Sequence, residues 1–263
     1  MIIGSAAGAV TLPNKNNSSV AFGGAVAGCS TFPNSLETGA DGAVTGSVID
    51  TADPKIGVGC LSQDGTDDFT NIDGAEGFST TVGTISFWVN PSSTANGGVL
   101  CFADTSTNER LEISLAFGTL NVIMALSSGV QWESNQSGID LDSWHNIVLV
   151  QDGVEVKFYS DNVEQTVFAN STDKSKWLTG NIDNARIGCV NRNNQGNIDF
   201  WNGLVDDLGL WNTAIDSATR DTIYNSGTGA AISTLSDCAG IKAYYNCNSL
   251  TNSTLLNNAS PAS

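Results

Sequence analysis

Basic residues are scarce in this chain of 263 residues, which has ten lysines and arginines against 27 acidic residues. The formal net charge is therefore −17 at pH 7. Nucleic-acid binding needs basic groups that displace counterions from phosphates, and ten scattered cations supply no such patch. Attraction to anionic lipid is disfavoured for the same reason. The composition argues against nucleic-acid partners and favours divalent cations.

Long hydrophobic runs are also absent. No segment approaches the length of a transmembrane helix, and the first ten residues have neither a basic region nor a long apolar core. We therefore expect no membrane insertion and recognise no secretory signal. Charged residues make up only 14% of the chain, so the surface must consist largely of Asn, Ser, Thr and Gly. Such a surface suits an extracellular or virion-surface protein.

Histidine occurs once, at His145, and the six cysteines form no CxxC pair. These absences exclude a zinc site built from local Cys/His spacing. The place of His145 at the start of a strand-like run favours packing over catalysis, and no nucleophile elbow, phosphate loop or nucleotide fingerprint is present. An even cysteine count permits disulfides, for example a small loop closed by Cys238 and Cys247. Buried free thiols are the alternative.

What the sequence does contain is short alternating runs. Residues 111–117 and 120–126 alternate apolar and polar positions around a predicted Gly118–Thr119 turn, as half-buried antiparallel strands do. Residues 144–168 predict a three-stranded meander. Its two-residue turns fall at Asp152–Gly153 and Asp161–Asn162, where positive φ angles are tolerated.

One helix is predicted over residues 217–225, with Asp216 as N-cap and Gly227 as C-cap. About a dozen short strands with one helix predict an all-β fold, a two-sheet antiparallel jelly-roll sandwich. We expect three regions along the chain. Residues 1–50 form a Gly/Ala/Ser-rich N-terminal arm and first strand, with a loop-rich stretch at 41–46; residues 51–232 form the jelly roll; residues 233–263 form a closing strand and tail.

Five segments stand out when they are taken together and in order: residues 55–69 (KIGVGCLSQDGTDDF), 84–91 (TISFWVNP), 144–148 (WHNIV), 204–211 (LVDDLGLW) and 223–229 (IYNSGTG). Together they resemble the LamG-like or concanavalin A-like lectin/glucanase superfamily. The resemblance implies the jelly-roll fold, but the superfamily contains lectins, adhesion modules, hydrolases and structural proteins.

Two adjacent carboxylates, Asp206 and Asp207, interrupt the last central strand. Neighbours in a regular strand point to opposite faces, so this pair does not normally bind one ion. The resemblance implies a structural calcium ion at Asp206, with Asp64, Asp67 or Asp68, or carbonyl groups near the N-terminal segment, as further ligands. The alternative is a solvated carboxylate pair at a strand end, and an acidic loop at 64–68 that is only a polar turn without EF-hand spacing.

Two tryptophans outside the family motifs, Trp132 and Trp177, lie near Asn/Ser-rich sequence. Flat aromatic rings stack on sugar faces, and amide groups satisfy sugar hydroxyls. The sequence therefore offers a candidate glycan platform at these rings. The alternative is that they cover the sandwich ends or a subunit interface. The polar partners that we predict are Asn135, Asn191, Arg192 and Asn193.

Glycoside hydrolysis needs two carboxylates across one sugar. The resemblance implies that the hydrolase branch carries them in a Glu-x-Asp-x-x-Glu strand, and no such string occurs. We predict a non-catalytic binding or adhesion module that recognises a glycan or cell-surface polysaccharide, with calcium as a candidate structural ion. The alternative is a structural protein, such as a virion fibre, decoration or surface-layer subunit, that assembles as a homo-oligomer or with other partners. A glycan hydrolase is the least favoured.

Overall fold

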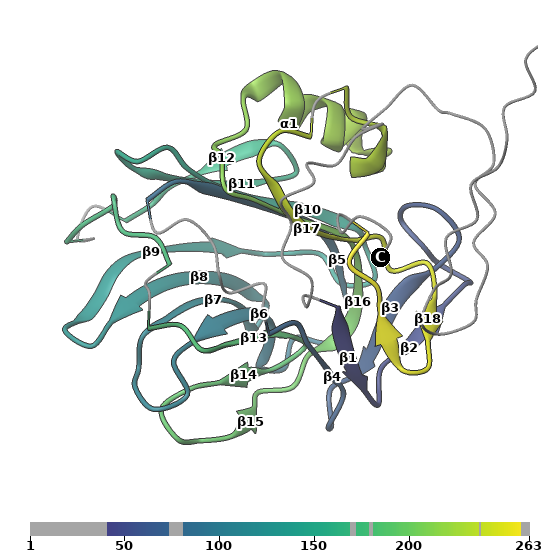
Figure 1. The fold of residues 1–263 in the computed structure, drawn as a ribbon, viewed down its shortest axis with the longest axis horizontal. Coiled ribbons are helices and arrows are strands. Elements are labelled where there is room, and N and C mark those ends of the chain that lie inside the picture. The colour runs from purple at the N-terminus through teal and green to yellow at the C-terminus, as the bar shows by residue number, and fades with distance from the viewer. Residues whose placement is uncertain (1–40, 74–80, 169–171, 179–180, 237, 259–263) are drawn as a thin grey trace, which may run out of the picture.

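The computed structural model describes residues 41–73, 81–168, 172–178, 181–236 and 238–258. Most of the predicted N-terminal arm, residues 1–40, lies outside the described residues. Two antiparallel sheets pack face to face, so the predicted jelly-roll sandwich is confirmed (Figure 1). Residues 41–46, predicted as a loop-rich stretch, contain a strand of the larger sheet, which corrects that prediction.

The larger sheet has nine strands. In spatial order they are β18 (Leu250–Thr251), β19 (Thr254–Leu255), β1 (Gly42–Thr45), β4 (Phe69–Asn71), β13 (Asn184–Ile187), β6 (Gly97–Ala103), β7 (Arg110–Ala116), β8 (Thr119–Leu126) and β9 (Gly129–Ser137).

The second sheet has eight strands. In spatial order they are β12 (Val163–Gln165), β11 (Val156–Ser160), β10 (His145–Gln151), β5 (Gly83–Pro91), β16 (Asn202–Trp211), β3 (Cys60–Asp64) and β2 (Val48–Asp50), and β17 (Ile241–Tyr245) pairs with β16 beside this path.

Smaller elements cover the outer faces of the sandwich. Helix α1 (Ser217–Tyr224) lies over the eight-stranded sheet, and the hairpin of β14 (Val190–Asn191) and β15 (Asn197–Ile198) lies under the nine-stranded sheet (Figure 1). Two short 3-10 turns follow α1: η1 (Asn225–Gly227) and η2 (Ile232–Thr234). The predicted N-cap is confirmed, because the side chain of Asp216 accepts a hydrogen bond from the backbone N–H of Thr219. The C-cap is Asn225 in the left-handed conformation, not Gly227.

Alternation fixes which side chains enter the core. Leu111, Ile113 and Leu115 of β7 are buried there, and Leu120, Val122 and Met124 of β8 pack with them. The residues between them therefore face away from the core, on the outer face of the nine-stranded sheet. The prediction of half-buried antiparallel strands is confirmed.

Turn chemistry explains the hairpins. Asp161 and Asn162 have φ angles of 50° and 62°, and the predicted two-residue turn between β11 and β12 is confirmed. The β7–β8 turn is at Phe117–Gly118, one residue earlier than predicted. The prediction of a two-residue turn at Asp152–Gly153 is wrong, because residues 152–155 form a longer loop between β10 and β11. The Asp152 side chain accepts bonds from two backbone N–H groups of this loop, which stabilises it.

The predicted loop closed by a disulfide between Cys238 and Cys247 is wrong. Cys238 is disulfide-bonded, whereas Cys247 is a buried free thiol, so these two residues do not close a loop. Cys60, Cys101 and Cys189 are also buried free thiols.

The central strand β16 changes its partner half-way along. Residues 202–205 pair with β3, residues 208–211 pair with β17, and the register against β5 shifts between Asp206 and Gly209. Asp207 has a φ angle of 49° at this bulge. Val205 and Leu208 both enter the core, so the two carboxylates between them lie together on the outer face. The expectation that Asp206 and Asp207 point to opposite faces is therefore wrong.

Candidate glycan and metal sites

The carboxylate of Asp206 binds the chain segment that leads into β3. Its Oδ2 atom accepts hydrogen bonds from the backbone N–H groups of Lys55 at 3.0 Å and Ile56 at 2.8 Å. Its Oδ1 atom accepts a bond of 2.8 Å from the N–H of Asp207. Asp206 is fully buried, and burial, with the nearby charge of Asp207, raises the pKa of its carboxyl to about 8.

Asp207 accepts hydrogen bonds from β17 and from the segment that precedes it. Its Oδ1 atom accepts a hydrogen bond of 2.6 Å from the Tyr244 hydroxyl, and its Oδ2 atom accepts one of 3.0 Å from the N–H of Ile232. Burial raises the pKa of this carboxyl to about 6, although both hydrogen bonds oppose the shift. Each aspartate at the bulge thus ties one incoming segment to β16.

Hydrogen bonds reach both oxygen atoms of each of these carboxylates. The recorded partners of Asp206 and Asp207 are N–H and O–H donors, which favours a structural role for the pair, and a calcium ion at Asp206 stays a prediction. Asp64 lies opposite Asn202, four residues before Asp206 on β16, which is about 13 Å along the strand. The structure therefore does not bring Asp206 and Asp207 together with Asp64 and Asp67. Carbonyl groups near the N-terminal segment, the other predicted ligands of an ion at Asp206, stay a prediction.

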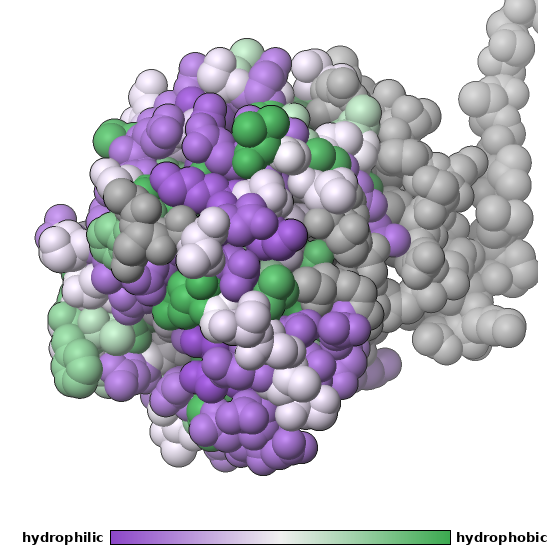
Figure 2. All heavy atoms as spheres, turned by 90° about the vertical axis from the view of Figure 1, so that its left-hand side faces the viewer, coloured by the Kyte–Doolittle hydropathy of each residue, from purple (hydrophilic) through white to green (hydrophobic). Residues whose placement is uncertain are grey.

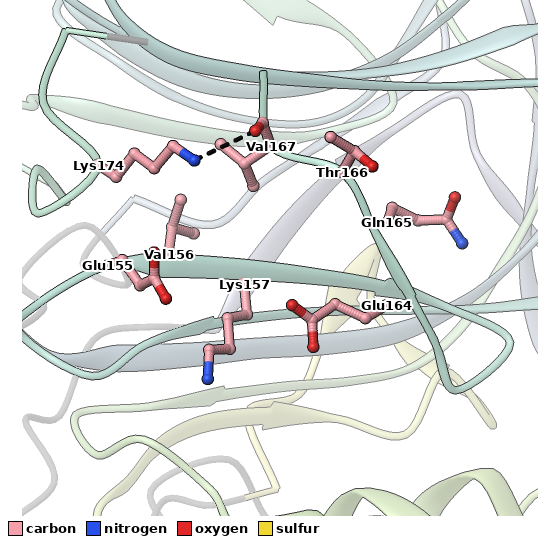
Figure 3. Close-up of a pocket in the computed structure, with 8 residues that line it drawn as sticks. All are labelled: Glu155, Val156, Lys157, Glu164, Gln165, Thr166, Val167 and Lys174. Atoms are coloured by element: carbon pink, nitrogen blue, oxygen red, sulfur yellow. Dashed lines mark hydrogen bonds between the residues drawn. The ribbon is translucent and has the colours of Figure 1, made fainter. Parts of the chain in front are cut away.

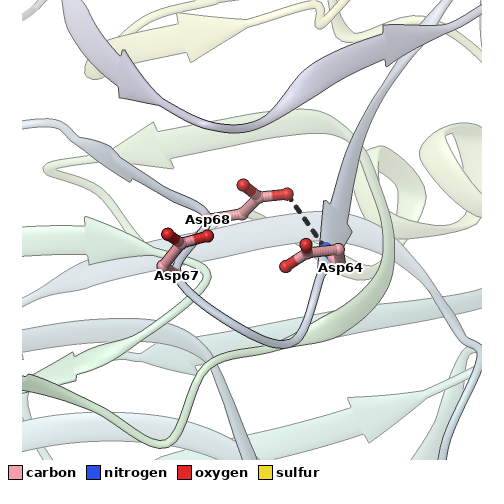
Figure 4. Close-up of side chains that lie close together, drawn as sticks. All are labelled: Asp64, Asp67 and Asp68. Carbon is pink, nitrogen blue, oxygen red and sulfur yellow. Dashed lines mark hydrogen bonds between the residues drawn. The ribbon is translucent and has the colours of Figure 1, made fainter.

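Asp64 and Asp67 meet a third carboxylate instead. Ligand oxygens of Asp64, Asp67 and Asp68 all lie within 4.8 Å of one another in the β3–β4 turn (Figure 4). The Oδ2 atom of Asp68 accepts a bond of 3.0 Å from the N–H of Asp64. Burial raises the pKa of Asp68, and the charges of Asp64 and Asp67 add to the effect. The three oxygens match the ligand type that calcium prefers, so a calcium role stays a prediction for Asp64 and Asp67.

The two tryptophans predicted as a sugar platform are buried in the main core, with exposed fractions of 0% for Trp132 and 2% for Trp177. The Trp132 Nε1–H group donates a hydrogen bond of 2.7 Å to the backbone carbonyl of Lys176. A ring without an exposed face cannot stack on a sugar. The prediction of a stacking platform at Trp132 and Trp177 is therefore wrong, and both rings hold the segment 172–178 against the sandwich.

The predicted polar partners lie on the outer side of the nine-stranded sheet. Asn135 of β9 pairs with Asn121 of β8, which pairs with Ser114 of β7, and this row faces away from the core. Asn135 is exposed and the other two are partly exposed.

The β14–β15 hairpin lies on this same face. The Arg192 Nη1 atom donates to Asn108 Oδ1 at 3.1 Å, and its Nε atom lies 3.5 Å from Glu112 Oε2 on β7. The N–H of Asn193 donates to the Thr107 carbonyl at 2.8 Å. The structure thus places Asn135 and the Asn191–Asn193 hairpin on one outer face, with β7 and β8 between them.

His145 has the structural environment that the sequence predicts. Its Nδ1 atom lies 2.8 Å from Asp161 Oδ2, and its Nε2 atom lies 3.1 Å from the Asp140 carbonyl. Burial alone would lower the pKa of His145, but the hydrogen bond and charge of Asp161 raise it above its usual range. These contacts hold the loop before β10 against the β11–β12 turn.

Sequence reasoning missed a pocket of about 370 Å³ at the edge of the eight-stranded sheet (Figure 3). Lys157 and Lys174, together with Glu155 and Glu164, supply its charged groups. One signal was available: three of the six lysines fall between residues 157 and 176 of a strongly acidic chain. Their convergence with the two glutamates depends on the fold.

The side of the molecule at the left of Figure 1 is mostly hydrophilic, with hydrophobic residues only in small separate groups (Figure 2). Among the described residues, no helix has the length and apolar character needed to span a membrane.

A family model described as the concanavalin A-like lectin/glucanases superfamily matches residues 64–219. No curated protein matches the sequence.

Solved structures share the fold at low sequence identity. A point mutant of the NanB sialidase from Streptococcus pneumoniae has 17% identity and a TM-score of 0.52, with 65% of this chain covered; the chain spans 28% of the sialidase. Domain 4 of AbnA, an extracellular arabinanase from Geobacillus stearothermophilus solved with arabinotriose, has 20% identity and a TM-score of 0.52, covering 72% of this chain and 88% of that one. The binding domain of botulinum neurotoxin serotype D has 12% identity and a TM-score of 0.52, covering 73% and 48%. Such identities show a common fold and no more.

Proposed function

The chain belongs to the concanavalin A-like lectin/glucanase superfamily, and from that membership we propose that it is a non-catalytic, surface-exposed module that binds glycans. The ligand is a glycan or a cell-surface polysaccharide. The setting that fits this activity is the outside of a cell or virion, where an uncharged polar surface is common.

The observation that carries the proposal is the outer face of the nine-stranded sheet. Amide and hydroxyl groups of Ser114, Asn121 and Asn135 form a row across three strands, and the Arg192–Asn193 hairpin tip borders the same face. Amides and hydroxyls both donate and accept hydrogen bonds, as sugar hydroxyls require. The arabinanase domain with bound arabinotriose shows that this fold accommodates a sugar in another protein.

The buried carboxylates support a role without catalysis. Glu109 accepts bonds from Ser127 Oγ at 2.7 Å and Asn181 Nδ2 at 3.0 Å. Glu112 accepts bonds from Arg110 Nε at 2.8 Å and Ser114 Oγ at 3.0 Å. Groups held in this way stabilise the loops and the sheet.

Calcium is the second part of the proposal, at the turn that contains Asp64, Asp67 and Asp68. An ion there would relieve the repulsion between three clustered carboxylates and stiffen the β3–β4 turn. Its test is the melting temperature in EDTA and in excess calcium. Calcium should raise the value in the native chain and not in Asp67→Asn; an unchanged value in the native chain would contradict the calcium part alone.

A glycan array probed with the labelled full chain tests the binding function. We expect binding to a defined group of oligosaccharides, weakened by Asn135→Ala and by Arg192→Ala. Asn96→Ala removes an exposed asparagine from the β5–β6 loop and should bind as the native chain does. A folded chain that binds no glycan on the array would contradict the proposal, and release of reducing sugar from a bound glycan would overturn its non-catalytic part.

A further inference from the structure

The pocket at the edge of the eight-stranded sheet lies where the chain crosses from one sheet to the other. Strand β11 contributes Lys157, and β12 contributes Glu164 and Gln165. Thr166 and Val167 follow β12. Lys174 lies next to Val167, across the pocket from Lys157 and Glu164 (Figure 3). The pocket is distinct from the row of Ser114, Asn121 and Asn135 on the other sheet.

Both walls of the pocket are held by hydrogen bonds. On one side, the Ser134 hydroxyl donates to the Thr166 carbonyl at 2.7 Å, and the N–H of Phe168 donates to the Glu133 carbonyl at 3.0 Å. These bonds fix the crossing segment to β9. The pocket wall is therefore preformed, which lowers the entropy cost of binding.

On the other side, the carbonyl of Lys174 accepts bonds from the N–H of Val156 at 2.9 Å and from Gln151 Nε2 at 3.0 Å. The Lys174 ammonium donates to the Val167 carbonyl at 3.2 Å and so spans the pocket (Figure 3). Buried Trp132 and Trp177 anchor the segment that carries this lysine.

The pocket lining contains both positively and negatively charged side chains, and this mixture favours one charge class of ligand. Two ammonium groups supply donors, two carboxylates supply acceptors, and the Gln165 amide supplies both, so the formal charge of the lining is zero in a chain of charge −17. An anion would meet Glu155 and Glu164, and a cation would meet Lys157 and Lys174. A neutral polyhydroxylated ring satisfies both kinds of group, because each hydroxyl donates and accepts. The partly exposed Val167 adds an aliphatic surface for the ring carbons.

We propose that this pocket binds one end of a neutral oligosaccharide, as a sugar subsite separate from the outer face of the nine-stranded sheet. The volume of about 370 Å³ is at the small end for ligand pockets and limits the bound part to a short terminal segment. The proposal rests on the proposed glycan-binding function and gives it a second location and a preference for neutral sugars.

Backbone amide shifts in NMR titrations of the full chain test the proposal. The probes are neutral trisaccharides, arabinotriose, maltotriose and cellotriose, and the acidic trimer of galacturonic acid. We expect at least one neutral probe to shift the amides of residues 155–157, 164–167 and 174, and the acidic trimer to leave them unchanged.

Variants then assign the contacts. Lys157→Met and Glu164→Gln should each weaken binding of the neutral probe about tenfold, the loss expected for one charged hydrogen bond. Lys176→Met removes the same charge two residues beyond Lys174, outside the pocket lining, and should bind as the native chain does. Unchanged spectra away from the pocket would show that the variants are folded.

The outcomes separate this proposal from the function on which it rests. Shifts confined to the outer face, with no effect of Lys157→Met or Glu164→Gln, would overturn the pocket and leave glycan binding in place. Tighter binding of the acidic trimer at the pocket would overturn the preference for neutral sugars. No shift with any probe, together with an empty glycan array, would overturn both.

Discussion

At the scale of single residues, Asp206 makes a pH-dependent contribution to stability. The pKa of an unfolded aspartate is about 3.9, and burial raises that of Asp206 to about 8. The folded chain therefore binds a proton more tightly than the unfolded chain between these values, and this group makes stability fall as pH rises from about 4 to about 8. We expect Asp206→Asn to flatten this fall, measured as the free energy of unfolding in urea at several pH values.

Asparagine has one acceptor oxygen, so the variant loses either the bond from the N–H of Asp207 or both bonds from the N–H groups of Lys55 and Ile56, which lowers stability at every pH. The pH dependence of the free energy of unfolding is therefore the quantity to compare. Asp142→Asn removes the same formal charge from an exposed loop residue, at a φ angle of 52° that asparagine tolerates, and should keep the native slope. Equal slopes in the native chain and in Asp206→Asn would show that Asp206 does not titrate in this range.

Phe117 is an aromatic residue with an unusual exposure and an unusual backbone conformation. It is 86% exposed at the tip of the β7–β8 hairpin and has a φ angle of 51°, a conformation that suits asparagine or glycine better than an aromatic residue. Phe117→Asn should raise the free energy of unfolding by about 1 kcal/mol, because strain is relieved and little burial is lost. Urea denaturation measures the change. Lower stability in the variant would mean that the exposed ring makes stabilising contacts.

At the scale of elements, one buried side-chain contact supports the pairing of β17 with β16. Tyr244 is buried, and its hydroxyl bonds the carboxylate of Asp207 at 2.6 Å. Tyr244→Phe leaves that carboxylate without this donor and should cost about 1.5–3 kcal/mol of stability. Hydrogen exchange should accelerate first in residues 241–245.

Tyr224→Phe is the matched control. Tyr224 stacks on Trp88 with ring centroids 6.1 Å apart, and a phenylalanine keeps that contact. We expect little change in stability or in exchange of β17. Equal losses in both variants would show that the Asp207 contact has no special role.

At the scale of the whole molecule, the net charge of −17 acts against the folded state through repulsion between carboxylates. Raising NaCl from about 20 mM to about 200 mM shortens the screening length below about 10 Å and should raise the melting temperature. Differential scanning calorimetry measures the shift. A decrease would show that local attractive pairs, such as Arg110 with Glu112, outweigh the general repulsion.

Much of the fold could be predicted from the sequence because the relevant signals are local. Alternation over residues 111–126 decides which side chains of β7 and β8 enter the core. Asp161–Asn162 accepts the positive φ angles of a tight turn, and Asp216 caps α1. Each of these sequence patterns depends on residues that are close together in the chain, so it can be recognised without the tertiary structure.

The sites were less predictable because they depend on contacts between distant segments. Trp132 and Trp177 lie in Asn/Ser-rich sequence, yet non-local packing buries both rings. A pocket formed from β11, β12 and Lys174 requires that three segments meet at one edge.

The sequence by itself determined that the chain forms a two-sheet sandwich, since periodicity and turn residues act over a few positions, and its five motifs carry the resemblance to this superfamily. Only the tertiary structure decided the role of Asp206 and Asp207. A bulge cancels the alternation that should separate them, and donors from residues 55–56, 232 and 244 occupy their oxygens. Such donors come from segments up to 151 positions away in the chain, and no local pattern encodes that distance.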